Sequence, residues 1–370
     1  MKILSFQPQS LYENGGAARL LRRLYAGRET QVTSLFVNYS FTPIKIGKVK
    51  EIFISVFPKH RSWMRWKLRS FFSWLRDKLF FSLTKKKLLR TAFKIPFDVL
   101  HIVNHSVYSS AICDEALLDK KKLWVSFHDH FSTTHSSFED TMYLWNRADR
   151  RLLISKALGE EYQRLFGENT FELITDGVSE QEISQPKKLN SNNIIIYFSG
   201  LLHLEYYPLF DTLAEALDKL STENKSFTLI LRGVEKLPLL NNRKFKVEYR
   251  TDFISDAEIK KEQDQADILY LPIKFSHPEF YLYSLSTKMI GYLGSSGRIL
   301  YHGPDDSAAY IALKNNEASS NCLSLNIGDM LNSIEKLLEP DNKVSFNAKK
   351  MAQNYFVLND IQKSFWNETN

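Results

Sequence analysis

Cysteine is scarce in this chain, which has Cys113 and Cys322 among 370 residues. Two cysteines so far apart argue against a disulfide-stapled secreted scaffold and for a reducing compartment. Long apolar runs are missing too, since no stretch approaches the ~18 uncharged residues of a membrane-spanning helix. The apolar run at residues 3–6 is much shorter than the core of a signal peptide. We therefore expect a cytoplasmic protein.

Several catalytic signatures are also missing. The chain has no Gly-x-x-x-x-Gly-Lys-Ser/Thr phosphate loop, no Gly-x-Ser-x-Gly nucleophile turn and no cysteine pair at zinc spacing. These absences weigh against an ordinary nucleotide hydrolase, a serine hydrolase and a zinc finger. His128 and His130 could face the same way beside His135, but no further cysteine or carboxylate group joins them. We expect no metal site.

Glycine is sparse, yet four of its 14 occurrences lie within thirteen residues, at Gly291, Gly294, Gly297 and Gly303. Average glycine usage is about 7%. In a glycine-poor chain, such a cluster indicates a place where bare backbone approaches a ligand.

The residues just before this cluster favour an anion. Ser286 and Thr287 are suited to cap a helix, and Lys288 falls in its first turn. Free N–H groups, the helix dipole and a lysine together favour a phosphate group. The alternative is a solvated helix start without a ligand.

Short apolar strands alternate with helical stretches, which predicts an α/β protein with parallel sheets. The first series of expected strands is Lys2–Phe6, Gln31–Val37, Val99–Val103, Leu123–Phe127, Arg151–Ile154 and Glu172–Ile174. The second is Ile194–Phe198, Phe227–Leu231, Lys246–Tyr249, Ile268–Leu271 and Arg298–Tyr301. We predict two Rossmann-like domains, residues 1–178 and 194–345, joined by a polar linker at 179–193. Residues 346–370 are expected to return as helices toward the first domain.

A set of short segments occurs in a characteristic order along most of the chain. They are Met1-Lys-Ile-Leu-Ser-Phe with Asn14-Gly15-Gly16, Val125-Ser-Phe-His128-Asp129, Ala148-Asp-Arg-Arg-Leu-Leu-Ile-Ser155, Ile174-Thr-Asp-Gly177-Val, Ala266-Asp-Ile-Leu-Tyr-Leu-Pro272, and the stretch from Ser284 to Ser307. The ordered set resembles the glycosyltransferases of the GT-B fold, in particular family 4 and its group 1 bacterial relatives.

The resemblance implies two Rossmann-like domains facing across a cleft, with a nucleotide-diphosphate sugar in the C-terminal half and the acceptor in the N-terminal half. Transfer would retain anomeric configuration and need neither a metal nor a cofactor. His128, at the end of an expected strand, would be catalytic by positioning donor or acceptor. The donor would be bound by Gly15, Gly16, Arg19, Ser199, Gly200, Arg232, Ser286, Thr287, Lys288 and Tyr292. From the residues alone, Gly15-Gly16 could also be an ordinary turn, and His128 a structural loop histidine.

The chain departs from the family pattern at two points. The glutamate that binds the donor's ribose should fall at Gly291 or Tyr292, and neither carries a carboxylate. The arginine that meets the pyrophosphate is missing after Phe198-Ser199-Gly200. Arg232, at the end of the next expected strand, could supply this charge instead.

Positive charge is concentrated between Lys59 and Lys94, where twelve Lys or Arg face a single acid, Asp77. Leu68, Phe71, Phe72, Leu75 and Leu79 recur at helical spacing and predict a buried stripe, with aromatic residues such as Trp74 left on the other side. Such a helix suits an anionic bilayer surface. The expected membrane contacts are Trp63, Arg65, Trp66, Arg69, Trp74 and Arg76. The alternatives are a helix buried on both sides with a solvated basic edge, and, less favoured, a nucleic-acid site.

These observations together predict a glycosyltransferase of bacterial cell-surface polysaccharide synthesis, peripheral on the cytoplasmic face of the membrane, with a saccharide or lipid-linked acceptor and no nucleic-acid partner. A catalytically degenerate GT-B binding protein, a nucleotide-sugar epimerase and a peripheral scaffold that uses the basic stretch alone remain as alternatives. The missing glutamate favours the degenerate protein. An epimerase has no need of a membrane-binding segment.

Overall fold

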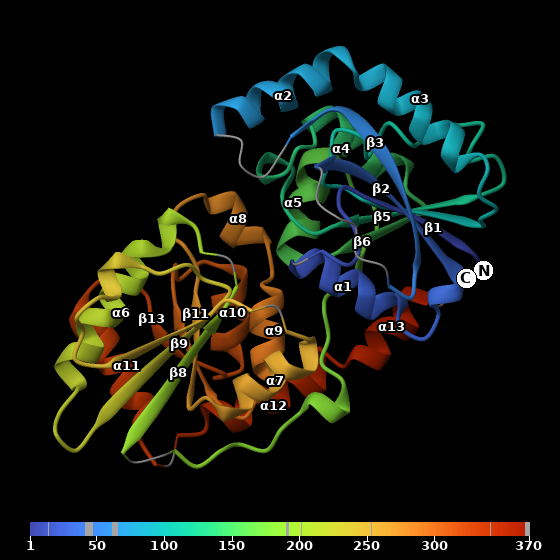
Figure 1. The fold of residues 1–370 in the computed structure, drawn as a ribbon. Helices are drawn as coiled ribbons and strands as arrows, with labels where there is room; N and C mark the ends of the chain where they lie inside the picture. Colours follow the sequence, from blue (N-terminus) through green and yellow to red (C-terminus); the bar gives the residue numbers. More distant parts are fainter. Residues whose placement is uncertain are drawn as a thin grey trace. The chain divides into compact units, whose positions relative to one another are not determined.

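The computed structural model describes residues 1–13, 15–40, 47–60, 66–189, 192–200, 202–252, 254–340 and 342–366. The chain divides into two units (Figure 1). Unit 1 contains residues 1–175 together with the chain end from Ser364, and unit 2 contains residues 176–363. Each unit is a parallel β-sheet with helices around it, which confirms the predicted α/β architecture of two Rossmann-like domains.

Unit 1 has a seven-stranded sheet in the order β3-β2-β1-β4-β5-β6-β7, in which every pair is parallel. Its strands are β1 (Ile3–Gln7), β2 (Val32–Ser40), β3 (Lys50–His60), β4 (Val99–Val103), β5 (Lys122–Phe127), β6 (Arg150–Leu153) and β7 (Glu172–Leu173). Its helices include α1 (Gly16–Tyr25), α2 (Trp66–Leu79), α3 (Phe81–Ala92), α4 (Phe138–Arg147) and α5 (Lys156–Phe166). Every residue of β1 and β4 is buried, as expected for central strands covered on both faces.

Unit 2 has a six-stranded parallel sheet in the order β10-β9-β8-β11-β12-β13. Its strands are β8 (Asn193–Ser199), β9 (Ser226–Arg232), β10 (Lys246–Arg250), β11 (Ile268–Pro272), β12 (Arg298–His302) and β13 (Ser320–Cys322). Its helices include α6 (Tyr207–Leu220), α7 (Asp256–Gln265), α8 (Pro278–Tyr283), α9 (Thr287–Leu293), α10 (Ala308–Asn315), α11 (Ile327–Leu338) and α12 (Val344–Tyr355). The core packs α6 and α11 against these strands through aliphatic and aromatic side chains.

The strand order reverses once in each sheet, between β1 and β4 in unit 1 and between β8 and β11 in unit 2. At such a point the connections leave in opposite directions, so the carboxyl ends of the two strands are left open to a ligand. The residues after β1 and β4, and those after β8 and β11, are therefore the candidate ligand-binding residues.

The C-terminal helices are divided between the two units. Residues 346–363 belong to unit 2 together with the rest of α12, and the chain returns to unit 1 at Ser364. The end of α13 (Leu358–Trp366) does belong to unit 1, where the Trp366 indole donates a hydrogen bond of 2.8 Å to the Leu24 carbonyl.

Strand β3 has no counterpart in the sequence prediction. It is an edge strand, in which Ile54 and Val56 are buried whereas Phe53 and Phe57 are exposed. Pro58 lies near its end, where no outer neighbour needs a hydrogen bond. Pro58, followed by Lys59 and His60, is not typical of a strand and obscures the alternating pattern in the sequence.

Candidate functional site

The carboxyl ends of β8 and β9 in unit 2 are each followed by an exposed glycine. Gly200 has φ +136° and Gly233 has φ +74°, values that side chains with a Cβ rarely adopt. The Gly200 N–H donates to the Arg232 carbonyl at 3.1 Å, and the Gly233 N–H donates to the Arg250 carbonyl at 2.8 Å. Two turns of bare backbone thus lie next to each other at the edge where parallel sheets bind ligands.

Lys288 reaches this edge from α9. Its Nζ lies 3.8 Å from the centroid of the Phe198 ring, and a Cβ built on Gly200 would come within 3.2 Å of the same nitrogen. Glycine at position 200 is what allows the approach. Although part of the residue is exposed, burial around its amine lowers the pKa of Lys288 to about 7. No acid is ion-paired with Lys288 within the described ranges, so a bound anion would be its missing partner.

The residues beside Lys288 have the local structure that the sequence predicts. Ser286 is the N-cap of α9 and its side chain accepts a hydrogen bond from the Met289 N–H at 3.4 Å. Thr287 is the first helical residue, and both hydroxyl-bearing residues remain partly exposed. Ser199, the last residue of β8, is also partly exposed. Their contact with a donor stays a prediction.

Tyr292 lies on α9, the helix that also carries Lys288. Its side chain is completely buried, and burial raises the pKa of its hydroxyl. Gly291 beside it is buried as well. Tyr292 therefore packs in the core of unit 2, beside Ser199 at the end of β8, and its contact with a donor stays a prediction.

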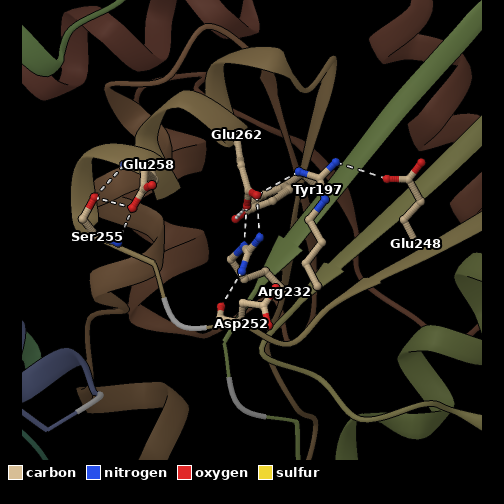
Figure 2. Close-up of polar contacts among 8 residues, drawn as sticks. Tyr197, Arg232, Glu248, Asp252, Ser255, Glu258 and Glu262 are labelled. Atoms are coloured by element: carbon tan, nitrogen blue, oxygen red, sulfur yellow. Dashed lines mark hydrogen bonds and ion pairs between the residues drawn. The ribbon is translucent and has the colours of Figure 1, made fainter.

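Arg232 is held by a carboxylate that the sequence analysis overlooked (Figure 2). Glu262 of α7 accepts two hydrogen bonds from Arg232, at 2.5 and 2.6 Å, and further ones from Arg250 and Tyr197, each at 2.8 Å. Burial alone would raise the pKa of Glu262, but these donors lower it. The remaining Arg232 contact goes to the Asp252 carbonyl.

Arg232 consequently does not present the unneutralised charge expected of a pyrophosphate ligand. Glu262 lies 30 residues away in the sequence, on the helix after β10. The packing of α7 against this edge of the sheet brings Glu262 next to Arg232, and the sequence alone does not show this ion pair. Lys288 is then the stronger candidate for the contact with phosphate.

In unit 1, Gly15 is the N-cap residue of α1 and its carbonyl accepts from the Arg19 N–H at 3.0 Å. Its φ of +151° favours glycine. Gly16 begins the helix, whose buried face carries Leu20, Leu21, Leu24 and Tyr25. The predicted turn before a helix is present, and the contact of Gly15, Gly16 and Arg19 with a donor stays a prediction.

His128 follows β5 at its carboxyl end, as predicted, but is only 4% exposed. Burial lowers the pKa of His128 to about 4, although the neighbouring Asp129 opposes this shift. The imidazole is therefore neutral near pH 7. Its Nδ1 has no hydrogen-bond partner in the described part of the chain. The catalytic role of His128 stays a prediction.

A cavity of about 410 Å³ opens at the reversal point of the unit 1 sheet. It is lined by residues that follow β1 and β4, by Tyr39 near the end of β2, and by one face of α2; the lining includes Pro8, Arg76, Asp77, His105 and Ser106. The sequence analysis singled out neither Tyr39 nor His105. His105 follows Val99–Val103 just as His128 follows β5, so the same rule of strand ends would have found it.

Helix α2 contains the predicted apolar stripe but does not have the predicted orientation. The stripe expected to be buried is partly on the surface, with Leu68, Phe71 and Leu79 exposed by 44%, 53% and 65%. Trp74 is exposed as predicted.

Arg76 does not contact a membrane, because it is only 7% exposed and faces the cavity. Its guanidinium stacks on Tyr39 at 4.4 Å and donates to Ser73 at 2.8 Å, which explains why a charged residue is buried here. The side chains of Trp66 and Arg69, and all of Trp63 and Arg65, lie outside the described parts of the structure.

No group of three or more His, Cys, Asp or Glu side chains among the described residues is arranged to hold a metal ion. No helix among them is both long and apolar enough to cross a bilayer.

Comparison with known proteins places the fold. No family model and no curated protein matches the sequence. Among solved structures, a trehalose-phosphate synthase (UDP-forming) from Burkholderia xenovorans, in complex with glucose-6-phosphate, matches with a TM-score of 0.65 and 10% identity, over 98% of this chain and 99% of the other. The E. coli trehalose-6-phosphate structure bound with UDP-2-fluoro glucose matches with a TM-score of 0.62 and 11% identity, over 99% and 98%.

An α-glucosyltransferase in complex with UDP and a 13-mer DNA matches similarly, with a TM-score of 0.60 and 12% identity over 99% and 98% of the two chains. The agreement extends over nearly the whole length of each protein. The chain therefore has the GT-B fold, that of the nucleotide-sugar glycosyltransferases it resembles.

Proposed function

We propose that this protein is a glycosyltransferase that moves a sugar from a nucleotide-diphosphate sugar to a saccharide-bearing acceptor. The fold supports the proposal, because the similar structures include enzymes bound to UDP or to a UDP-sugar. The observation that carries it is the buried amine of Lys288 beside the bare backbone of Gly200. A cation in this position stabilises the negative charge that grows on the departing diphosphate.

The chemistry follows from this placement. Donor phosphates lie at the ends of β8 and β9, where the turns at Gly200 and Gly233 lack side chains and allow close approach, and Lys288 supplies the charge. Arg232 has two of its five N–H groups left after its contacts with Glu262 and Asp252. The neutral imidazole of His128 positions donor or acceptor. Transfer with retention and without a metal belongs to the same proposal, as does a role in cell-surface polysaccharide synthesis.

The outer face of α2 supports a place on the membrane. Leu68, Phe71, Trp74 and Leu79 are exposed there, while the polar side of the same helix faces inward. A helix on a solvated surface normally buries its apolar side and exposes its polar side. The opposite arrangement in α2 indicates that its apolar face binds an apolar partner. Exposed cations accompany it along α2 and α3, at Lys67, Lys78, Lys85, Lys86, Lys87 and Arg90. An anionic bilayer at the cytoplasmic surface satisfies both properties.

The test of the donor site is calorimetry with UDP and uridine. Replacing Lys288 with alanine removes one charged hydrogen bond, worth about 1.5 to 3 kcal/mol, so UDP should bind at least tenfold more weakly while uridine is little affected. Lys219→Ala, on the exposed end of α6, is the matched control. Equal losses for UDP and uridine would remove Lys288 from the phosphate site.

The test of the membrane surface is sedimentation with vesicles. Reversing the charges of Lys85, Lys86 and Lys87 should release the protein from anionic vesicles, since each cation near the surface contributes about 1 kcal/mol. Leu68→Ser with Phe71→Ser should also weaken binding, with little change in its dependence on salt. Failure of the wild type to sediment with these vesicles at low salt would refute this part of the proposal.

A second candidate, a GT-B protein that binds a nucleotide sugar without turnover, is favoured by the absence of a carboxylate at Gly291 and Tyr292. Both residues are buried, so neither replaces the missing group. Release of UDP from a UDP-sugar, followed with and without saccharide acceptors, separates the two functions. Binding without any release would favour the second.

A further inference from the structure

The cavity of unit 1 lies directly beneath the helix whose outer face is apolar. The residues of α2 that line it are Ser70, Ser73, Arg76 and Asp77, at helical spacing. Leu68, Phe71 and Leu79 lie on the opposite side of the helix and are exposed. One helix thus separates a polar cavity from an apolar, cation-rich surface.

The polar groups of the cavity are fixed before any ligand arrives. Arg76 is nine-tenths buried between the Tyr39 ring and the Ser73 hydroxyl. Its Nε lies 3.3 Å from Asp77, which also accepts a hydrogen bond from Ser73 at 3.2 Å. A guanidinium held in this way offers its N–H groups at a set position, at little entropic cost.

Residues that follow β4 also line the cavity. His105 Nε2 lies 3.1 Å from the Asp129 carboxylate, which orients the ring. Ser106 is buried and lies 3.4 Å from the Tyr39 hydroxyl. The cavity is also lined by Pro8 and Gln9 after β1, and by Val107 and His135.

These groups match the chemistry of a sugar ring. Arginine and serine donate hydrogen bonds to ring hydroxyls, aspartate accepts from them, and aromatic and proline surfaces cover the apolar face of a ring. The opposite charges of Arg76 and Asp77, which both line the cavity, cancel, so this pair leaves no excess charge that would require an anion. Its volume lies within the roughly 300 to 1,000 Å³ of small-molecule sites.

We propose that this cavity holds an uncharged sugar unit of the acceptor, and that the acceptor is a glycolipid whose lipid remains in the bilayer on the other side of α2. The inference rests on the proposed function, since it names the acceptor of the same reaction. It also explains why α2 turns its polar side inward: the helix has a carbohydrate on one face and a membrane on the other. Arg76 and Asp77 are then acceptor-binding residues.

The experiment measures binding of octyl glycosides, below their micelle concentrations, to the full chain by saturation-transfer NMR and calorimetry. The panel contains octyl α- and β-glycosides of glucose, galactose, mannose, rhamnose and N-acetylglucosamine. We expect at least one to bind the wild type. Ser70→Trp, which places an indole in the cavity from a position exposed on α2, should weaken that binding at least tenfold. Asp77→Asn, which keeps the shape of the side chain, should weaken it about tenfold.

Ser82→Trp, at an exposed position of α3 away from the cavity, is the matched control and should bind the glycoside like the wild type. UDP affinity and sedimentation with anionic vesicles should be unchanged in Ser70→Trp and Asp77→Asn. These two readouts report on Lys288 and on the outer face of α2, so they distinguish failure of this inference from failure of the proposed function. Absence of glycoside binding by the wild type, or full binding by Ser70→Trp, would overturn the inference.

Discussion

Binding of a nucleoside diphosphate should draw a proton onto Lys288. The free protein holds this amine in a buried position, which lowers its pKa from 10.5 to about 7. A diphosphate next to the amine would restore the charged form, because an opposite charge favours ionisation. Protonation of Lys288 and binding of the diphosphate are then coupled, so proton uptake reports on binding and the pH dependence of the affinity reports on protonation.

The size of the effect follows from the two pKa values. With a free pKa of about 7, roughly one tenth of the protein carries the Lys288 proton at pH 8, and nearly all of the complex carries it if the pKa returns toward 10.5. About 0.9 proton is therefore taken up per UDP bound at pH 8. The affinity should fall about 50-fold between pH 7 and pH 9, or about 2.3 kcal/mol.

Calorimetry at pH 8 in buffers of different ionisation enthalpy measures this uptake directly. The pH is chosen because a phosphate with a pKa near 6 is already ionised there. Lys288→Arg, whose guanidinium stays charged, should bind UDP without proton uptake and with a flat pH profile. Lys288→Met should bind weakly and with the same flat profile. If the wild type binds UDP at pH 8 with no proton uptake, Lys288 does not contact the diphosphate.

Three further predictions concern the residues around these sites. Gly200→Ala should destabilise the protein by about 1 to 3 kcal/mol and weaken UDP binding, because a φ of +136° strains a residue with a Cβ and that Cβ would press on the Lys288 amine; urea unfolding and calorimetry measure the two effects. Glu262→Ala should cost about 3 to 5 kcal/mol by leaving Arg232 unpaired in a largely buried position. Its control, Glu248→Ala, should cost less than about 1 kcal/mol because that pair is more exposed; similar losses for both would contradict the reasoning. Burial lowers the pKa of His128 from 6.5 to about 4, so the unfolded chain binds a proton that the folded chain refuses as the pH falls from 6.5 to 4. This residue alone should lower stability in this window by up to about 1.4 kcal/mol per pH unit, in addition to the effect of His101 and His302, whose pKa values burial lowers in the same way. Urea unfolding of His128→Leu should show a shallower decline, and an unchanged slope would be evidence against a neutral buried histidine.

Most of the secondary structure could be predicted from the sequence, because the signals are local. Val99–Val103 forms a strand with the expected bounds, and the expected helix from Thr287 is present, capped by Ser286. Continuous apolar runs mark strands buried on both faces, and hydroxyl residues mark helix starts whatever lies further along the chain. The alternation of these elements already predicts parallel sheets, and the GT-B fold confirms that prediction.

The orientation of α2 could not be predicted in the same way. Periodicity shows that the helix has two faces, and burial was assigned to the apolar one. The structure turns Arg76 inward because Tyr39 and Ser73, from other turns and strands, give its guanidinium a stacking surface and a hydrogen-bond acceptor. Without those partners, burial of an arginine would carry a large desolvation cost.

The sequence by itself determined where the strands and caps lie, which glycines permit unusual backbone, and which stretch of the chain is strongly basic. The tertiary structure alone decided which side chains are paired. Glu262 neutralises Arg232 and no acid in the described residues neutralises Lys288, although both cations follow from similar local patterns. The physical reason is that a charge's chemistry depends on burial and on partners brought together from distant parts of the chain, and no local pattern encodes either.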